Sequence, residues 1–424
     1  MASFTDLVAN RIQQRLDEFK ENITSTPKND SERVLAEGIR TRWHRLDHVL
    51  SAGEPQVLTG SAAAVDGSQA VRALNTGADW IIAQALLIGP GGLRLSDAET
   101  FLLRGDILRP SIDRCAALLM RHLELDLAHK YVESGAADLV LLDGSLYADL
   151  PHLLYPLDIP DHDDLPLLVL QSYLDLFDRC QQQGVLLVGI AKSARSVMLG
   201  RAILDGMLVP VSSEQTHVGV AEEDTMKPDP TADAISIPGR RRKGKAGWNG
   251  LPRDSELLYR WAEGAGLTDP VLLGTASFER YTAEVLSNPA SLAGQFRSGW
   301  LSAGDRERVL NRLLDAPAIG TVYLRPTAGD DALRVDALAG NFGRGDLRLL
   351  GLVHGWAPYT AALSLVQRLL GEYGGLNVYN AALYVVDREV RLHTETVDHV
   401  YLSVLRRLLE HPIQYDRSTR RFLR

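Results

Sequence analysis

Two aspartates in this chain each close an apolar run and are followed by the same two residues, Gly-Ser. The first is Asp66, after residues 63–65, and the second is Asp143, after residues 139–142. Each run predicts a buried strand, and the glycine lets the backbone turn or approach a ligand closely. Carboxylates at the ends of neighbouring strands converge, and a cation between them relieves their repulsion. The pair therefore predicts a hard-metal site, with turn chemistry at a strand end as the alternative.

The hydrophobic pattern predicts strands and helices that alternate through most of the chain, which is typical of an α/β fold. Strands are expected over residues 56–66, 79–88, a short stretch after Gly92, 139–143, 185–191, 271–277, 319–325, 332–337 and 381–386. Helices are expected over residues 4–22, 31–50, 111–134, 166–183, 304–315, 356–371 and 394–410.

The positions of the acidic residues within this order indicate a ribonuclease-H-like core. Asp66 ends the first strand, Glu124 lies on the first long helix after it, and Asp143 ends the fourth strand. Such a core gathers carboxylates around divalent metal for phosphodiester cleavage. Mg²⁺ or Mn²⁺ suits an all-oxygen site. A solvated helix position is the alternative for Glu124, and Asp126 and Glu133 are its rivals on the same helix.

The chain divides into four segments by composition. Residues 1–50 are expected to form a helical N-terminal extension, and residues 51–211 the first half of a nuclease core with its acidic motifs. Residues 212–252 carry an acidic and then a basic patch without apolar periodicity, which predicts a flexible charged insertion. Residues 253–424 hold the second half of the core and the C-terminal helices. The expected fold is a mixed sheet flanked by helices, with this extension and insertion.

Composition limits the cellular location and the class of partner. The 424 residues carry a net charge of −9, which argues against a wholly basic nucleic-acid-binding surface but permits a local basic groove. The apolar runs are too short to span a bilayer and the N-terminus lacks a signal-peptide core, so a cytoplasmic protein without membrane contact is expected. Cys115 and Cys180 are expected to be buried packing residues rather than a disulfide.

Three other kinds of site fit the sequence poorly. Residues 239–246 approach a phosphate-binding loop, but Ala246 lacks the hydroxyl that binds Mg²⁺ and no apolar strand precedes the loop. This basic run is interpreted either as a contact for DNA phosphates or as a solvated loop. The 11 histidines show no zinc-like spacing, and Asp66-Gly67-Ser68 is not a serine-hydrolase elbow.

Several motifs, taken in order, resemble the NurA family of nucleases. They are Val-Asp-Gly-Ser at 65–68, Met-Arg-x-Leu-Glu at 120–124, Leu-Leu-Asp-Gly-Ser-Leu at 141–146, and Lys-Ser at 192–193 after a strand. Nearer the C-terminus, residues 379–383 resemble the family's Tyr-Pro-x-x-Leu, and residues 386–388 resemble its Ala-His or Ala-Asp. Asn380 stands where the family has proline, and Asp387 stands where it often has histidine.

The resemblance implies more than the residues alone can support. It implies a Mn²⁺-dependent (or Mg²⁺-dependent) DNA nuclease with 5′-to-3′ exonuclease and single-strand endonuclease activity. It also implies a homodimer that docks on a hexameric HerA-type ATPase, a translocase, for DNA end resection. The residues alone indicate only a metal-dependent phosphodiesterase.

Four carboxylates are the candidate metal ligands and catalytic residues. Asp66, Glu124 and Asp143 would hold one or two metal ions, which activate water and stabilise the leaving oxygen. Asp387 would complete the cluster if it reaches the other three.

Three residues are candidates for contact with DNA. Lys192, also a candidate catalytic residue, is expected to neutralise the scissile phosphate or orient the nucleophile. Tyr379 is expected to stack on a base or to hydrogen-bond a phosphate, and Arg388 to contact a phosphate. The alternatives are an exposed lysine, a half-buried core tyrosine and a surface arginine.

A non-catalytic subunit is the alternative function. It would be a dimeric docking platform for a hexameric ATPase, with an acidic cluster that is structural or degenerate, and the departures at Asn380 and Asp387 are its support. Whether Asp66, Glu124 and Asp143 reach one cation separates the two hypotheses.

The amphipathic N-terminal helix also has two interpretations. It either packs on its own core or helps the chain to dimerise or dock on a translocase. Its apolar positions are Phe4, Leu7, Val8, Ile12, Leu16 and Phe19.

Overall fold

The structure is a computed structural model that describes most of the chain. The described residues are 4–23, 26–27, 29–50, 62–192, 196–206, 251–274, 288–297, 299–350, 354–410 and 412–417. Most of the predicted insertion at 212–252, including the basic run at 239–246, lies outside these residues.

One half of the sheet contains both acidic strands. Strands β2 (Ala62–Ala73), β3 (Asp79–Ile88) and β4 (Arg94–Leu103) form an antiparallel meander. Strand β5 (Leu139–Asp143) pairs in parallel with β2, and β6 (Leu186–Ala191) pairs in parallel with β5. The resulting spatial order, β4-β3-β2-β5-β6, is that of the ribonuclease-H-like core predicted from the acidic motifs.

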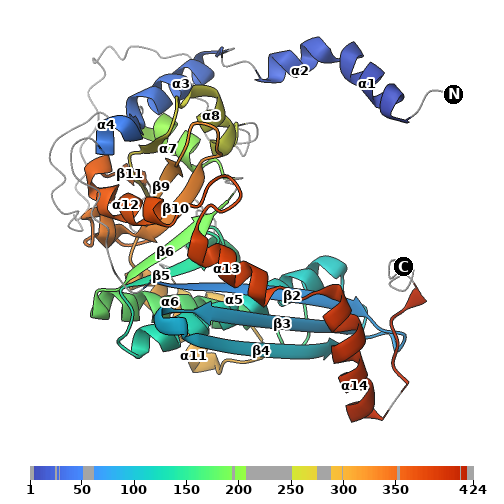
Figure 1. Cartoon of the computed structure of the whole chain (residues 1–424). Coiled ribbons are helices and arrows are strands. Elements are labelled where there is room, and N and C mark those ends of the chain that lie inside the picture. The colour runs from blue at the N-terminus through green and yellow to red at the C-terminus, as the bar shows by residue number, and fades with distance from the viewer. Residues whose placement is uncertain are drawn as a thin grey trace, which may run out of the picture.

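Strands of the C-terminal half, together with β1 from near the N-terminus, extend the same sheet beyond β6 (Figure 1). Strand β10 pairs antiparallel with β6, and β9, β7 and β1 follow in that order, while β8 pairs with both β9 and β11. The bounds are β1 Trp43–Arg45, β7 Gly266–Thr268, β8 Val271–Leu273, β9 Ile319–Arg325, β10 Leu333–Leu338 and β11 His354–Trp356.

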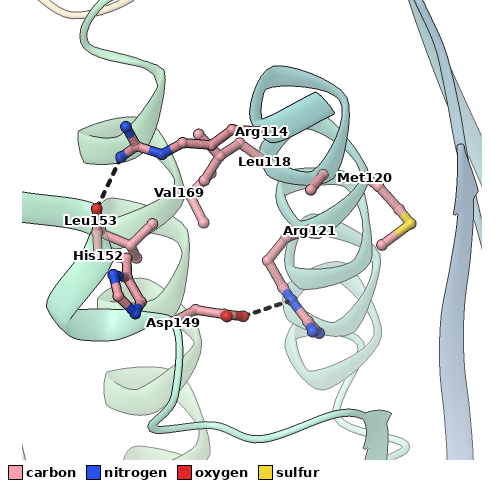
Figure 2. Close-up of a pocket in the computed structure, with 9 residues that line it drawn as sticks. Arg114, Leu118, Met120, Arg121, Asp149, His152, Leu153 and Val169 are labelled. Carbon is pink, nitrogen blue, oxygen red and sulfur yellow. Dashed lines mark hydrogen bonds and ion pairs between the residues drawn. The ribbon is translucent and has the colours of Figure 1, made fainter. Parts of the chain in front are cut away.

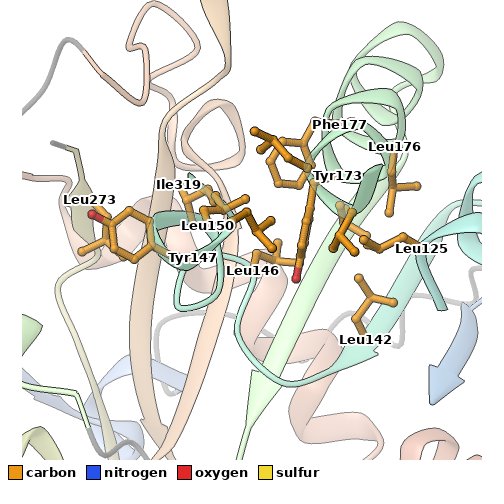
Figure 3. Packing of buried hydrophobic residues seen from close by; sticks show 14 of the residues in the cluster. Leu125, Leu142, Leu146, Tyr147, Leu150, Tyr173, Leu176, Phe177, Leu273 and Ile319 are labelled. Atoms are coloured by element: carbon orange, nitrogen blue, oxygen red, sulfur yellow. The ribbon is translucent and has the colours of Figure 1, made fainter. Parts of the chain in front are cut away.

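Helices cover both faces of the sheet around β2 and β5. On one face, α5 (Arg109–Glu133) and α6 (Leu165–Gln183) enclose a core that includes Tyr173 and Phe177 (Figure 3). On the other face, α13 (Ala381–Val390) contributes Leu383 and Val386 to a separate core. Cys115 and Cys180 are free and buried on α5 and α6, so the prediction of packing cysteines is confirmed.

The remaining helices surround these cores, except for α1 and α2, which project away from the body in Figure 1. Within the described residues no helix combines the length and apolarity needed to cross a membrane. The bounds are α1 Phe4–Gln14, α2 Leu16–Ile23, α3 Asp30–Arg42, α4 Leu46–Leu50, α7 Met198–Gly206, α8 Asp254–Trp261, α10 Pro289–Ala293, α11 Ala303–Asp315, α12 Leu363–Gly371 and α14 Leu402–Leu409. Short 3₁₀ segments lie at Pro90–Gly92, Leu150–Leu154, Ala339–Phe342 and Tyr359–Ala362, and a π-helical turn at Thr396–Tyr401.

The expected end of the first strand at Asp66 is wrong. Strand β2 continues to Ala73, because Gly67 and Ser68 stay extended and pair with Ala85 and Gln84 of β3. Asp66 therefore lies inside a strand, whereas Asp143 does end one.

Several other expected elements differ from the structure. The helix expected over 356–371 begins only at Leu363, after strand β11 and a 3₁₀ segment, and the short strand expected after Gly92 is the ten-residue β4. The single helix expected over 31–50 is interrupted at Trp43, where the chain pairs with β7; Gly266 of β7 leaves the space that the Trp43 ring fills. The strand expected over 381–386 is the helix α13, because Asn380 caps its N-terminus and the buried positions Leu383, Val386 and Val390 keep helical spacing.

Candidate active site

Three aspartates from distant parts of the sequence meet at one point. Each of Asp66, Asp143 and Asp387 offers a carboxylate oxygen, and these three oxygens lie within 4.8 Å of one another. Of the four predicted ligands, Glu124 is the one that does not belong to this mutually close group.

The pleat of the sheet explains why Asp66 and Asp143 point the same way. Ala64 and Leu141 pack in the core beneath α13, whereas their neighbours Val65 and Leu142 pack against α5 and α6. Successive side chains on a strand alternate between faces. Asp66, two residues after Ala64, and Asp143, two after Leu141, therefore point to the α13 face.

Helix α13 brings Asp387 to that face. Its C-terminal end is fixed to β2 and β3, because Gln84 donates to the carbonyl of Val390 (2.6 Å) and the Leu392 amide donates to Ser68 Oγ (2.9 Å). Asp387 also accepts a hydrogen bond from Arg391 one turn later (3.2 Å). Ser68 of the first Asp-Gly-Ser motif thus helps to hold the helix that carries the third aspartate.

Glu124 reaches the site from the opposite face of the sheet, through the space beside Gly67. A Cβ on Gly67 would come 2.5 Å from Glu124 Oε1, so this approach requires glycine. The side chain is buried, and its Oε2 lies 2.6 Å from Nη1 of Arg121. Apart from Arg121, no described residue pairs with that oxygen.

In the second Asp-Gly pair, Asp143-Gly144, the glycine likewise leaves space for an α5 side chain, here Arg121. Gly144 has φ of +105°, and a Cβ there would lie 2.9 Å from an Arg121 guanidinium nitrogen. Arg121 Nη1 also donates to the main-chain carbonyl of Asp143 (3.3 Å). Each aspartate therefore faces α13, while the glycine after it leaves room for a side chain of α5.

Lys192 and Tyr379 complete the cluster on the α13 face. Lys192 Nζ lies 2.7 Å from Asp143 Oδ2 and 4.7 Å from the centre of the Tyr379 ring. The Tyr379 hydroxyl donates a long hydrogen bond of 3.4 Å to the same Asp143 oxygen. Arg388 instead lies over the ring of Tyr384, 5.7 Å from its centre, and none of its described contacts is with the aspartates.

Burial in the site shifts the pKa values of two carboxyl groups upwards. Burial, and then the charge of Asp143, raise the pKa of Asp66 to about 6. Burial also raises the pKa of Glu124 to about 7, although Arg121 opposes this shift. Burial and the neighbouring carboxylates raise the pKa of Tyr379 as well, so its hydroxyl stays protonated and acts as a donor. Crowded carboxylates that are costly to ionise are typical of a cation site.

Sequence reasoning did not find Asp336, the residue that holds the turn after Asp143. Asp336 of β10 is fully buried; its Oδ2 accepts hydrogen bonds from Ser145 Oγ (2.5 Å) and the Leu146 amide (3.1 Å). Arg334 pairs with the same carboxylate at 2.8 Å. The sequence feature that could have revealed Asp336 is the pair Arg334 and Asp336 inside the apolar strand predicted over 332–337, because buried charges need partners.

The donor set fits a hard divalent cation. Three carboxylate oxygens lie close together, and a fourth buried carboxylate, Glu124, faces Gly67 with its Oε1 while its Oε2 pairs with Arg121. All four groups offer oxygen, the ligand atom that Mg²⁺ and Mn²⁺ prefer.

Comparison with known proteins identifies the family. The NurA domain family matches residues 60–392, a span that contains all the residues of the site. The chain belongs to the NurA nuclease family. The predicted resemblance is therefore confirmed over most of the chain.

Solved NurA structures share the fold of this chain. The NurA nuclease from Sulfolobus solfataricus is 14% identical, with 97% of this chain and 98% of that chain covered and a TM-score of 0.51. A NurA structure bound to dAMP and manganese is 15% identical, with 94% and 96% covered and a TM-score of 0.50. No curated protein matches the chain. In this NurA chain, the mixed sheet flanked by helices is thus the family fold.

Proposed function

We propose that this chain is a divalent-metal-dependent DNA nuclease that hydrolyses phosphodiester bonds at the aspartate cluster. The observation that carries the proposal is the convergence of carboxylate oxygens of Asp66, Asp143 and Asp387 within 4.8 Å of one another, with Glu124 buried against Gly67, the residue after Asp66. A NurA structure that contains dAMP and manganese supports Mn²⁺ as the metal and DNA as the substrate class. Mg²⁺ is the second candidate, because it also prefers oxygen ligands.

The four carboxylates would hold the metal ion. Asp66, Asp143 and Asp387 would bind it from the α13 face, and Glu124 from the side of Gly67. A bound divalent ion supplies positive charge against the scissile phosphate and lowers the pKa of water. The carboxylates orient that charge and are no longer costly to ionise once it is present.

Lys192 and Tyr379 would act on the DNA rather than on the metal. With a cation beside Asp143, the ammonium of Lys192 is free to pair with a phosphate oxygen, and its half-exposed position gives DNA access to it. The protonated Tyr379 hydroxyl, which donates to Asp143 here, would donate to a phosphate oxygen when DNA is bound. Arg388, on the same helix as Asp387, would contact a phosphate farther from the cut.

The finer properties implied by the family resemblance also belong to this proposal. They are 5′-to-3′ exonuclease and single-strand endonuclease activity, a homodimer, and docking on a hexameric HerA-type ATPase for end resection. Helix α1 supports a partner interface, because none of its residues is buried and Phe4, Leu7, Val8 and Ile12 are exposed.

Digestion of end-labelled DNA tests the proposed function. Single-stranded and duplex DNA would be incubated with Mn²⁺, Mg²⁺ or EDTA, with and without the candidate translocase, and the label at either end gives the polarity. Cleavage in Mn²⁺ or Mg²⁺ that EDTA abolishes is the expected result. A pure protein that binds DNA but cuts none under any of these conditions would favour the non-catalytic docking subunit.

The two sequence departures give that alternative little support. Asn380 caps α13 through a hydrogen bond from the Leu383 amide (3.0 Å) and donates to Glu372 (2.7 Å), so it starts the helix without proline. Asp387 lies in the aspartate cluster and supplies an oxygen where the family often has a histidine nitrogen.

A further inference from the structure

We infer that Arg121 is the positioning residue of the metal site, and that Asp149, across the cavity behind Arg121, keeps it in place. This inference rests on the proposed function and extends it to a residue that touches neither the aspartate cluster's carboxylates nor, by that proposal, the DNA. Arg121 would fix the buried carboxylate of Glu124 beside β2 and tie it to the main chain at Asp143.

The Arg121 guanidinium links helix α5, which carries Glu124, to the end of strand β5, which carries Asp143. Arg121 Nη1 lies 2.6 Å from Glu124 Oε2 on α5 and donates to the carbonyl of Asp143 at the end of β5 (3.3 Å). Glu124 would otherwise be held only by packing, because no described residue other than Arg121 pairs with its Oε2. A ligand carboxylate that is oriented by an outer partner binds metal more tightly.

The far side of Arg121 borders a cavity of about 270 Å³ between α5, α6 and the segment around Asp149 (Figure 2). Arg121 Nε lies 3.6 Å from Asp149 Oδ2 across this space, and about half of the Asp149 side chain is exposed. Asp149 thus gives the guanidinium a second negative partner on the side away from Glu124. The open space would let the side chain leave Glu124 if Asp149 were neutral.

Arg114 provides an internal comparison. It lies two helical turns before Arg121 on α5 and lines the same cavity, and in Figure 2 it reaches across toward the segment around His152. It donates to the carbonyls of His152, Tyr155 and Pro156 (2.7–3.0 Å) and to no carboxylate among its described hydrogen bonds. Arg114 therefore stabilises the fold around the cavity without a link to the metal ligands.

Calorimetric titration of Mn²⁺ into the full-length protein tests the inference, together with thermal unfolding of the metal-free protein. We expect Arg121→Met to weaken Mn²⁺ binding about 10- to 100-fold, the usual effect of losing an outer partner of a ligand. Arg121→Lys, which keeps the charge but not the two-way geometry, should lose less. Asp149→Asn should weaken binding about two- to fivefold, as for a partly exposed ion pair.

The control is Arg114→Met, which should lower Tm and leave the affinity for Mn²⁺ unchanged. The inference is overturned if Arg121→Met binds Mn²⁺ as the wild type does, or if Arg114→Met loses as much affinity as Arg121→Met. Should Arg121→Met fail to fold, unaltered affinity in folded Arg121→Lys overturns it equally. A wild-type protein that binds no Mn²⁺ would instead refute the proposed function.

Discussion

On β2 and after β5, the glycine that follows the aspartate leaves space for an α5 side chain on the opposite face of the sheet. Beside Gly67 lies the Glu124 carboxylate, and beside Gly144 lies the Arg121 guanidinium. A side chain at either glycine would have to displace that α5 side chain. The Asp-Gly pair recurs because the aspartate points to the α13 face while the glycine leaves room for an α5 side chain on the other face. Gly144 also has a positive φ, which favours glycine at that turn, whereas Gly67 does not.

The raised pKa of Asp66 makes stability depend on pH in a definite direction. Because the folded pKa is about 6 against 3.8 in an unfolded chain, the folded state binds more protons between these values. This contribution is present below about pH 4 and is lost as the pH rises through about 6. In EDTA, we expect Asp66→Asn to gain Tm relative to the wild type as the pH rises from about 4 to 7.

Addition of Mn²⁺ should reverse that difference, because the ion binds the anionic carboxylate and stabilises the wild type alone. Thermal unfolding across this pH range, with EDTA and with Mn²⁺, measures both effects. A difference in Tm that is independent of pH in EDTA would contradict the assigned environment of Asp66.

Substitution of Asp387 tests whether it is a metal ligand. Asp387→His should keep metal-dependent cleavage, since histidine also binds Mn²⁺. Asp387→Ala should lower the cleavage rate by about 100-fold or more, which exceeds the usual effect of losing a residue that only contacts a metal ligand. The rates would be measured on labelled single-stranded DNA at saturating metal. Wild-type activity in Asp387→Ala would remove this residue from the site.

At the scale of elements, the sequence predicted the core better than the C-terminal part of the site. The strands at 79–88 and 319–325 match the structure, because strong apolar runs specify buried strands. The continuation of β2 past Asp66 was missed because Gly67 and Ser68 resemble turn residues, and only pairing with β3 keeps them extended. Helix α13 was missed because short apolar runs do not distinguish helix from strand.

The close approach of α5 to β2 should tolerate no side chain at Gly67. Gly67→Ala would place a methyl group 2.5 Å from both Glu124 and the side chain of Met120, so we expect a loss of about 1–3 kcal/mol in stability. Weaker Mn²⁺ binding should accompany it. The matched control is Gly304→Ala in α11, where nothing lies within 4 Å of the added carbon. Equal unfolding free energies for the two variants would show that α5 can move away without cost.

At the scale of the whole molecule, the C-terminal half completes a site that the N-terminal half begins. Asp387 arrives on α13, and Asp336 on β10 holds Ser145 in the turn after Asp143. The sequence could place the four acidic motifs in order, but not the contacts between halves separated by about 200 residues. Those contacts depend on tertiary pairing between β10 and β6.

Helix α1 lies apart from this assembly, so its removal tests a role in partner binding. None of its residues is buried, and the nuclease core makes no evident use of it within the described part of the chain. Deleting residues 1–25 should spare Mn²⁺-dependent nicking of single-stranded DNA but reduce co-elution with the translocase and stimulated digestion of duplex ends. Unchanged affinity and stimulation would assign docking to another surface.

The most direct test of the central claim is anomalous scattering from crystals of the protein grown with Mn²⁺. The account predicts a manganese peak bound by the carboxylates of Asp66, Asp143 and Asp387, with Glu124 as a ligand from the opposite side. It also predicts that the peak disappears in Asp143→Asn crystals grown in the same way. A fully occupied manganese peak elsewhere, with none at the aspartate cluster of the wild type, would contradict it.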